Sequence, residues 1–226
     1  MEFLSFLPLV GGGVTLAIGL SFMKKHGVKE KSQLFFFLSL VCLGVFGILE
    51  TVAYSLDSKD AAYLVFIVSK AFAFCAPFFV MAFATNIRAE SRVYRVLMIP
   101  LLAVLIISIL GALEDIEKVS WGWKVIFRSP MEIVTTMMVI FFMSIAIYEL
   151  ARLLDGMKAE NDLYYPCMLV ITIGFVFWLL SAIVANAIVI YMGLDVPPLF
   201  SFVQVFPAIL VAYGYSLGSS KGMCGQ

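Results

Sequence analysis

The chain has 226 residues, of which 63% are hydrophobic and 13% are charged, and its mean hydropathy is +1.06. A water-soluble domain of this size has too little interior to bury so much apolar surface, which excludes a soluble globular protein. Lys and Arg balance Asp and Glu at 15 each, which excludes a basic nucleic-acid-binding protein.

Seven apolar runs are long enough for a helix to cross about 30 Å of hydrocarbon. They cover residues 3–23, 34–54, 62–85, 96–113, 131–151, 164–192 and 199–218. We therefore predict an all-α integral membrane protein, a seven-transmembrane-helix bundle that forms one domain over residues 1–218. Residues 219–226 are predicted to form a short cytoplasmic tail.

The basic residues between these runs predict the orientation of the bundle. Ten of the 15 Lys and Arg residues fall on one side and four on the other, while Lys70 lies inside a run. Because loops rich in Lys and Arg stay in the cytoplasm, the N-terminus is predicted outside and the C-terminus inside. The expected location is the cell membrane, crossed by several spans.

Small residues recur at helical spacing in the first and last runs. Gly11, Thr15 and Gly19 repeat in the first run, and Gly214 and Gly218 in the last. Such spacing lets membrane helices approach closely. It predicts tight packing inside one bundle, with a dimer interface as the alternative.

Five strongly polar side chains fall inside the predicted spans, all in the half of the membrane that faces outward. They are Glu50, Lys70, Glu132, Asn186 and Gln204. Ionisable groups in this environment are costly and usually functional, so we predict that these residues line an outward-facing ligand pocket. Lys70 and Glu50 are the expected ion pair. The alternatives are that Lys70 extends to the outer headgroups and that Glu132 only favours its helix N-terminus.

The predicted loop Glu114–Pro130 is the longest on the outer side and contains Trp121 and Trp123. Indole rings favour the headgroup layer, where an apolar ring meets a wet N–H group. The two tryptophans are therefore predicted either to anchor the loop at the membrane surface or to border the entrance of the pocket as part of a lid.

Several functional classes lack their required residues. The last predicted span contains no lysine for a retinal Schiff base, so a retinal protein is not expected. His26 is the single histidine, and no metalloprotease or phosphate-loop motif occurs. We predict no enzymatic activity, no cofactor and no metal.

Three stretches carry a resemblance to a known family. They are Tyr63–Arg88, then Trp121-Gly122-Trp123-Lys124 followed by Pro130, and finally Asn186 with Gly193-Leu194-Asp195-Val196-Pro197-Pro198. In these stretches the chain resembles the seven-transmembrane N-terminal sensor region of prokaryotic membrane histidine kinases. The resemblance implies an outward pocket that senses a small molecule or the state of the membrane. The tail Ser219–Gln226 carries no kinase, so signalling through a separate partner is expected.

These observations predict a receptor-like membrane sensor module that binds a small molecule or lipid and signals in trans to a cytoplasmic partner. The loops Lys24–Lys31 and Arg88–Arg95 are expected to contact that partner or anionic membrane lipids. A small-solute transporter or channel using the same polar residues is the alternative, and a scaffold subunit of a larger complex is a third.

Overall fold

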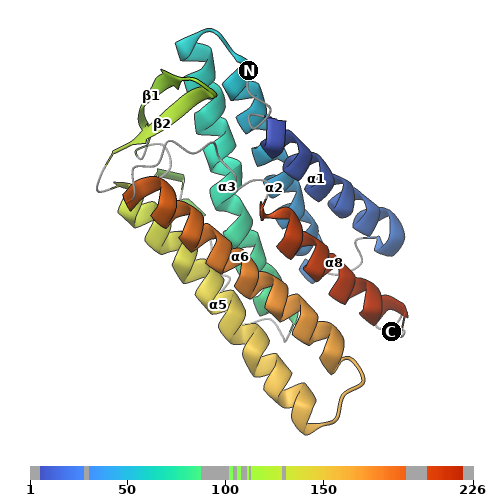
Figure 1. Ribbon diagram of the computed structural model, residues 1–226. Coiled ribbons are helices and arrows are strands. Elements are labelled where there is room, and N and C mark those ends of the chain that lie inside the picture. The colour runs from blue at the N-terminus through green and yellow to red at the C-terminus, as the bar shows by residue number, and fades with distance from the viewer. Residues whose placement is uncertain are drawn as a thin grey trace.

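The computed structural model describes residues 6–27, 31–87, 102–103, 106–107, 111, 113–128, 131–191 and 203–220. These residues are mostly helical, with one small sheet (Figure 1). The elements are α1 (Leu7–His26), α2 (Lys31–Ser55), α3 (Lys59–Ile87), β1 (Leu113–Val119), β2 (Gly122–Phe127), α5 (Met131–Ala159), α6 (Tyr165–Tyr191) and α8 (Val205–Ser220).

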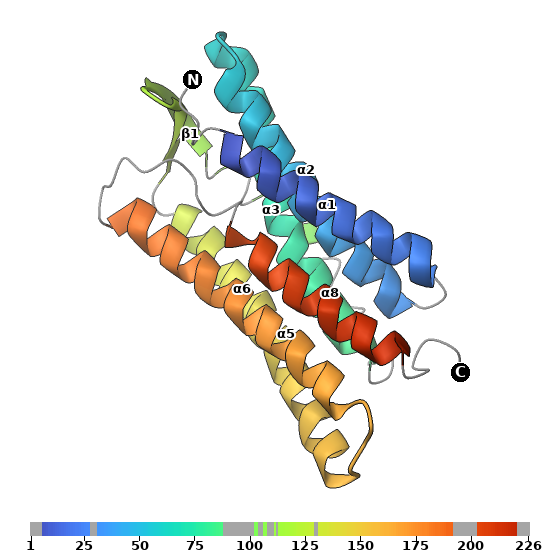
Figure 2. The same cartoon turned by 45° about the vertical axis from the view of Figure 1, so that its right-hand side comes forward.

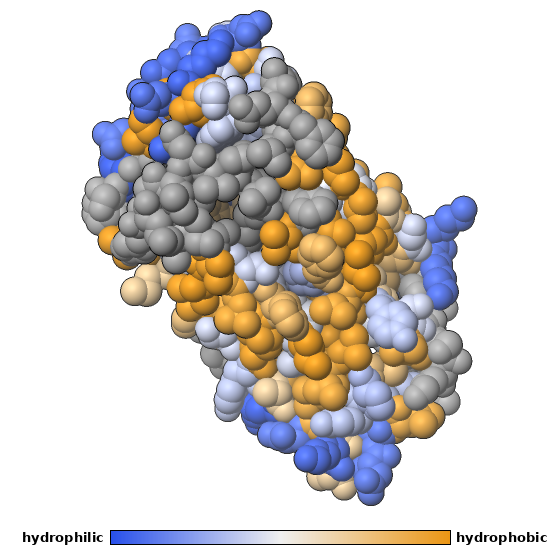
Figure 3. Space-filling model, in the orientation of Figure 1, coloured by the Kyte–Doolittle hydropathy of each residue, from blue (hydrophilic) through white to orange (hydrophobic). Residues whose placement is uncertain are grey.

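The helices have the length and composition of membrane spans. Five of the described helices, α1, α2, α3, α5 and α6, are long and apolar enough to cross a bilayer, and α8 contains a shorter apolar stretch, Val205–Leu217. Figure 3 shows an apolar surface between two hydrophilic ends, one of them over the hairpin. The described helices are therefore those of a mostly helical protein that is compatible with the predicted multi-pass membrane class. The predicted span 96–113, the start of the span 199–218 and tail residues 221–226 fall largely or wholly outside the described residues.

The prediction of an all-α protein is wrong for one segment, because β1 and β2 form an antiparallel hairpin. Residues 120 and 121 make the turn. The register shifts between Leu113 and Asp115, so Glu114 is the extra residue of a bulge. Because the bulge breaks the two-residue alternation, Leu113 and Ile116 are both buried although they are three residues apart. The hydropathy of this segment therefore gives a poor strand signal.

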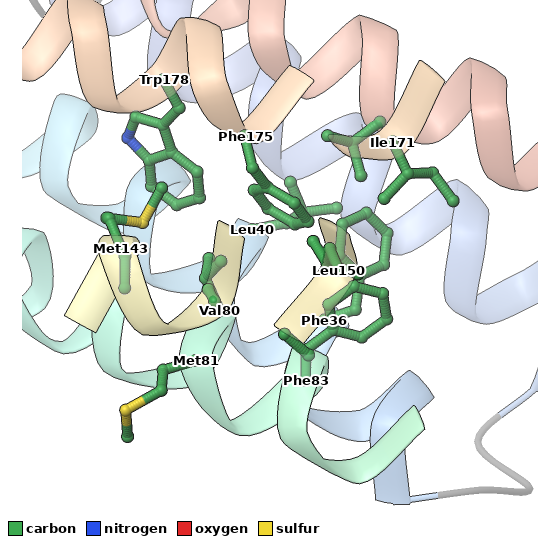
Figure 4. Close-up of a cluster of buried hydrophobic side chains, with 14 of the residues drawn as sticks. Phe36, Leu40, Val80, Met81, Phe83, Met143, Leu150, Ile171, Phe175 and Trp178 are labelled. Atoms are coloured by element: carbon green, nitrogen blue, oxygen red, sulfur yellow. The ribbon is translucent and has the colours of Figure 1, made fainter. Parts of the chain in front are cut away.

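The described helices pack around a shared core. α2 lies between α1 and α3, α3 contacts α5, α5 contacts α6, and α8 packs on both α6 and α1 (Figures 1 and 2). Large apolar side chains from α2, α3, α5 and α6 fill the interior of this arrangement (Figure 4). In a bilayer, lipid tails are as apolar as these side chains, so exclusion from water does not drive the helices together. Close packing of the side chains is then the main interaction between them.

Glycines allow the closest helix contacts. A methyl group added at Gly47 of α2 would lie 2.5 Å from the carbonyl oxygen of Pro8 in α1, and one at Gly12 would lie 2.6 Å from the carbonyl oxygen of Gly44. On α8, a methyl group at Gly214 would lie 2.7 Å from Ile171 of α6. The predicted small-residue packing is therefore confirmed at Gly214 and, on α1, at Gly19, where a methyl group would lie 3.2 Å from Leu40 Cβ. Gly12, next to Gly11, adds a still closer contact.

Five aromatic side chains join the helices at the end of the bundle away from the hairpin. We call Phe22, Phe36, Phe83, Phe175 and Tyr215 the aromatic cluster. The rings of Phe36 and Tyr215 stack with centroids 5.3 Å apart, and Phe36 also lies 5.0 Å from Phe22 and 5.5 Å from Phe83. The cluster thus connects α1, α2, α3, α6 and α8, and Phe36 is at its centre.

Candidate functional site

An ion pair lies inside the apolar part of the bundle, between α2 and α3. Lys70 Nζ donates a hydrogen bond to Glu50 Oε1 at 2.8 Å, and the side chains are 18% and 2% exposed. The Lys70 ammonium also lies 5.0 Å from the centroid of the Phe46 ring, within cation–π range. The predicted pairing of Lys70 with Glu50 is confirmed, and it neutralises two charges that would be costly alone in this environment.

The two residues meet although they start at different depths. Glu50 is five residues from the end of α2 and Lys70 is 11 residues from the start of α3. At 1.5 Å per residue this is an offset of about 9 Å. Side chains tilt toward the N-terminus of their own helix, and α2 and α3 run in opposite directions. Glu50 therefore leans away from the hairpin end of the bundle and Lys70 leans toward that end, which closes the gap between the two side chains.

Tyr54 connects the ion pair to the hairpin. It lies one helical turn beyond Glu50, and its hydroxyl hydrogen-bonds to the Glu50 carboxylate. Its ring makes edge contacts with Phe66 of α3, at 5.4 Å between centroids, and with Trp121 of the hairpin turn, at 5.5 Å. A movement of the hairpin turn would therefore reach Glu50 through a single side chain.

Specific contacts hold the hairpin over the ends of α2 and α3. Trp123 Nε1 donates a hydrogen bond to the Leu56 carbonyl oxygen at 2.7 Å. The Tyr63 hydroxyl donates to the Leu113 carbonyl oxygen at 3.1 Å. Gly122 has a positive φ of 143°, and a methyl group there would lie 3.0 Å from Tyr54 Cβ. The result is a second, separate core made of Ala53, Tyr54, Ala62, Phe66, Leu113, Ile116, Trp121 and Trp123.

The two tryptophans lack the wet, exposed rings expected of a membrane-surface anchor, while their place at the border of a pocket stays a prediction. Trp121 and Trp123 are only 7% and 6% exposed, because their rings pack inside the second core. The Trp123 N–H group bonds to backbone rather than to water at a membrane surface. Both rings thus act in hairpin docking, and Trp121 contacts Tyr54, which in turn contacts the ion pair.

Of the remaining predicted site residues inside the spans, Gln204 has a described side chain, and it does not lie at the ion pair. Gln204 is buried directly before α8, next to a void of about 10 Å³ that Leu43 and Trp178 also line. Leu43 is seven residues before Glu50 on α2, a separation of about 10 Å along the helix. The side chains of Glu132 and Asn186 lie outside the described residues, although their backbones belong to α5 and α6.

Sequence reasoning missed Tyr54 as a member of the site. The signal was present, because a tyrosine four residues after an intramembrane glutamate shares its helix face. It also missed Ser69, whose hydroxyl donates to the Phe46 carbonyl oxygen at 3.3 Å and joins the two helices beside the pair. Nothing in the hydropathy pattern marks a serine for that role.

A pH effect is expected at the hairpin. The hydrogen bond from Lys59 lowers the pKa of the Asp115 carboxyl below its ordinary value of 3.8, and the N–H group of Ile116 adds to this. A carboxyl with a lowered pKa in the folded state stabilises that state above its ordinary pKa, and the contribution is lost as pH falls through the lowered value. We expect tryptophan fluorescence to report hairpin loosening below about pH 4.

The Asp115→Asn variant is the control for that titration. It cannot lose a charge, so its fluorescence change between neutral pH and pH 3 is expected to be smaller than that of the unmodified protein. Equal changes in the two proteins would show that other carboxyls, rather than the Lys59–Asp115 pair, control the hairpin at low pH.

No group of three or more His, Cys, Asp or Glu side chains in the described part of the chain is placed to hold a metal ion. No protein-family model matches the chain, and no curated protein matches it significantly. The function is therefore inferred from the ion pair, the hairpin above it and the helices that connect them to the opposite end.

Proposed function

We propose that this protein is a receptor-like sensor of the cell membrane, which binds a small molecule or lipid from the outer side and signals to a cytoplasmic partner in trans. One observation carries the proposal: the buried Lys70–Glu50 pair contacts, through Tyr54, a hairpin that covers the ends of α2 and α3. A costly pair next to an exposed docking element is the arrangement expected of a ligand-controlled switch.

The exposures of the pair suggest the chemistry of the ligand. The Lys70 side chain is 18% exposed, whereas Glu50 is 2% exposed. A ligand therefore reaches the ammonium before the carboxylate. An anionic group on the ligand would compete with Glu50 for Lys70. The charge of the Glu50 carboxylate, which faces the Tyr54 hydroxyl, would then be less fully neutralised by Lys70. A carboxylate or a phosphate is the simplest group with this property.

Two helices provide a route to the opposite end. On α2, Glu50 is 14 residues from Phe36, which is about 21 Å along the helix. On α3, Lys70 is 13 residues from Phe83, and Pro77 lies between them. Since Phe36 and Phe83 belong to the aromatic cluster, a shift of α2 against α3 at the ion pair would repack the contacts among five helices. Pro77 removes one backbone hydrogen bond and offers a hinge for this motion.

The direction of signalling follows from the distribution of basic residues. The hairpin end is the side with fewer Lys and Arg residues and is proposed to face outward. The resemblance to the sensor region of prokaryotic membrane histidine kinases supports the same direction. The partner would then bind at the cytoplasmic loops Lys24–Lys31 and Arg88–Arg95.

Distances between spin labels at the cytoplasmic end test the proposal. Leu34→Cys on α2 and Lys158→Cys on α5 are both exposed positions for labels, once the native cysteines are replaced. In lipid nanodiscs, Trp123→Ala is expected to shift the distance distribution measured by double electron–electron resonance. The matched control is Ile126→Ala, a change of an exposed residue in the same strand.

An unchanged distance distribution in Trp123→Ala, with the hairpin shown to be undocked by protease cleavage, would contradict a sensor that couples the two ends. Solute flux into proteoliposomes distinguishes the proposed sensor from the alternative, a small-solute carrier or channel. Flux that depends on Lys70 would favour transport over sensing, because transport requires access to the site from both faces.

A further inference from the structure

A surface groove lies between α1 and α8, at the end of the bundle away from the hairpin. Its volume is about 410 Å³, and it is lined by Val14, Ala17, Ile18, Ser21, Phe22, Lys25, Ala212 and Ser216. α1 and α8 run side by side (Figure 2), and the Phe22 and Tyr215 rings, 4.8 Å apart, connect them. The groove is separate from the ion pair and the hairpin.

The lining changes character along the groove. The part toward the middle of the bundle is apolar, from Val14 to Ile18 on α1 with Ala212 on α8. The other end carries Ser21 and Lys25, one helical turn apart, and Ser216 from α8. No carboxylate of the described residues forms an ion pair with Lys25. The groove thus combines an apolar floor with a cationic, hydroxyl-bearing mouth.

The dimensions of the groove match one leaflet of a bilayer. Val14 and Lys25 are 11 residues apart, which is about 16 Å along a helix. Half of the hydrocarbon thickness is about 15 Å. A molecule in the groove would therefore lie in a single leaflet, with its polar end at Lys25 and its apolar part beside Val14 and Ala17.

We infer that this groove binds one anionic phospholipid, with an acyl chain along the apolar floor and the phosphate at Lys25, Ser21 and Ser216. The charge of the mouth favours an anionic lipid over a zwitterionic one, and the hydroxyls offer hydrogen bonds to phosphate oxygens. Basic sites between helices at the cytoplasmic side are typical for anionic headgroups. The inference does not depend on the proposed sensor function.

Native mass spectrometry of the purified protein tests this site. The protein is mixed with equal amounts of dioleoyl phosphatidylglycerol and dioleoyl phosphatidylcholine, and the lipid that stays bound is measured. We expect phosphatidylglycerol to be retained preferentially. Lys25→Ala is expected to lower that retention about tenfold, the equivalent of one charge-assisted hydrogen bond. Ala212→Phe, which fills the groove, is expected to lower the retention of both lipids.

Lys24→Ala is the matched control, because it removes the same charge from the neighbouring position, which does not line the groove. We expect this variant to retain phosphatidylglycerol within about twofold of the unmodified protein. Equal losses in Lys24→Ala and Lys25→Ala would overturn the proposal, since they would indicate general attraction to a basic surface. Full retention in Ala212→Phe, or equal retention of the two lipids by the unmodified protein, would also overturn it.

Discussion

Lys70→Met is expected to lower the free energy of unfolding by about 3–5 kcal/mol, the cost of leaving a buried charge without its partner. The residue that remains is Glu50, whose side chain is only 2% exposed. Glu50→Gln is expected to cost less, because the Lys70 side chain is 18% exposed and its long stem lets the ammonium move toward the surface. Unfolding in mixed detergent and dodecyl sulfate micelles measures both values.

The double variant Lys70→Met/Glu50→Gln is the decisive control. Since the lone charge is gone, the double variant is expected to be no less stable than Lys70→Met alone, and a double-mutant cycle then gives a large coupling energy. Additive effects would show that the two side chains act independently. Lys59→Met offers a matched comparison, because its partner Asp115 and Lys59 itself are about half exposed, so the loss is expected to stay below about 1 kcal/mol.

Gly47→Ala is expected to destabilise the protein by about 1–3 kcal/mol, the usual cost of forcing an extra group into a packed interface. The added methyl group would lie 2.5 Å from the Pro8 carbonyl oxygen, which belongs to the backbone of α1. A backbone atom cannot turn aside as a side chain does, so α1 must move away from α2. The same unfolding assay measures the loss, and cross-linking between α1 and α2 measures the separation.

Gly13→Ala is the matched control for Gly47→Ala. Gly13 lies on the same pair of helices, but a methyl group there meets nothing within 4 Å. We expect no loss of stability in this variant. A comparable loss in both variants would show that glycine is needed for backbone conformation rather than for the approach of the two helices.

The membrane helices and the ion pair were both predictable from the sequence, for related reasons. Apolar runs of about 20 residues leave few alternatives to a transmembrane helix, because backbone groups in lipid must bond within the segment. The same scarcity of water makes Lys70 and Glu50 conspicuous, since each needs a partner of opposite charge. A tight connection between α2 and α3 then makes their pairing the simplest solution.

The hairpin was not predictable in the same way. Residues 113–127 combine charged and apolar side chains, and the bulge at Glu114 shifts the buried positions out of alternation. The turn lacks the Asn-Gly or Asp-Gly pair that marks many two-residue hairpins. Its stability comes instead from docking: Trp123 and Ile116 are buried against α2 and α3, which are distant in the sequence.

The distribution of the other polar residues depended on information that hydropathy does not contain. The predicted depths of these residues in the membrane suggested that Gln204 would lie beside Glu50 and Lys70. The helix that follows it, α8, packs instead on α6 through Gly174 and Gly214, so Gln204 lies beside Leu43 and Trp178. Which helices are neighbours is decided by such close contacts, and a single sequence shows where small residues occur but not which helix they face.

The hairpin has a consequence for the order in which the chain assembles during synthesis. All the side chains that receive it, from Ala53 to Phe66, precede it in the sequence. In the proposed orientation residues 113–127 are translocated, and they can then dock on α2 and α3 while α5, α6 and α8 are still being translated. All the partners needed for hairpin docking are thus available before α5 is made, and we expect the later helices to insert beside an N-terminal part that is already packed.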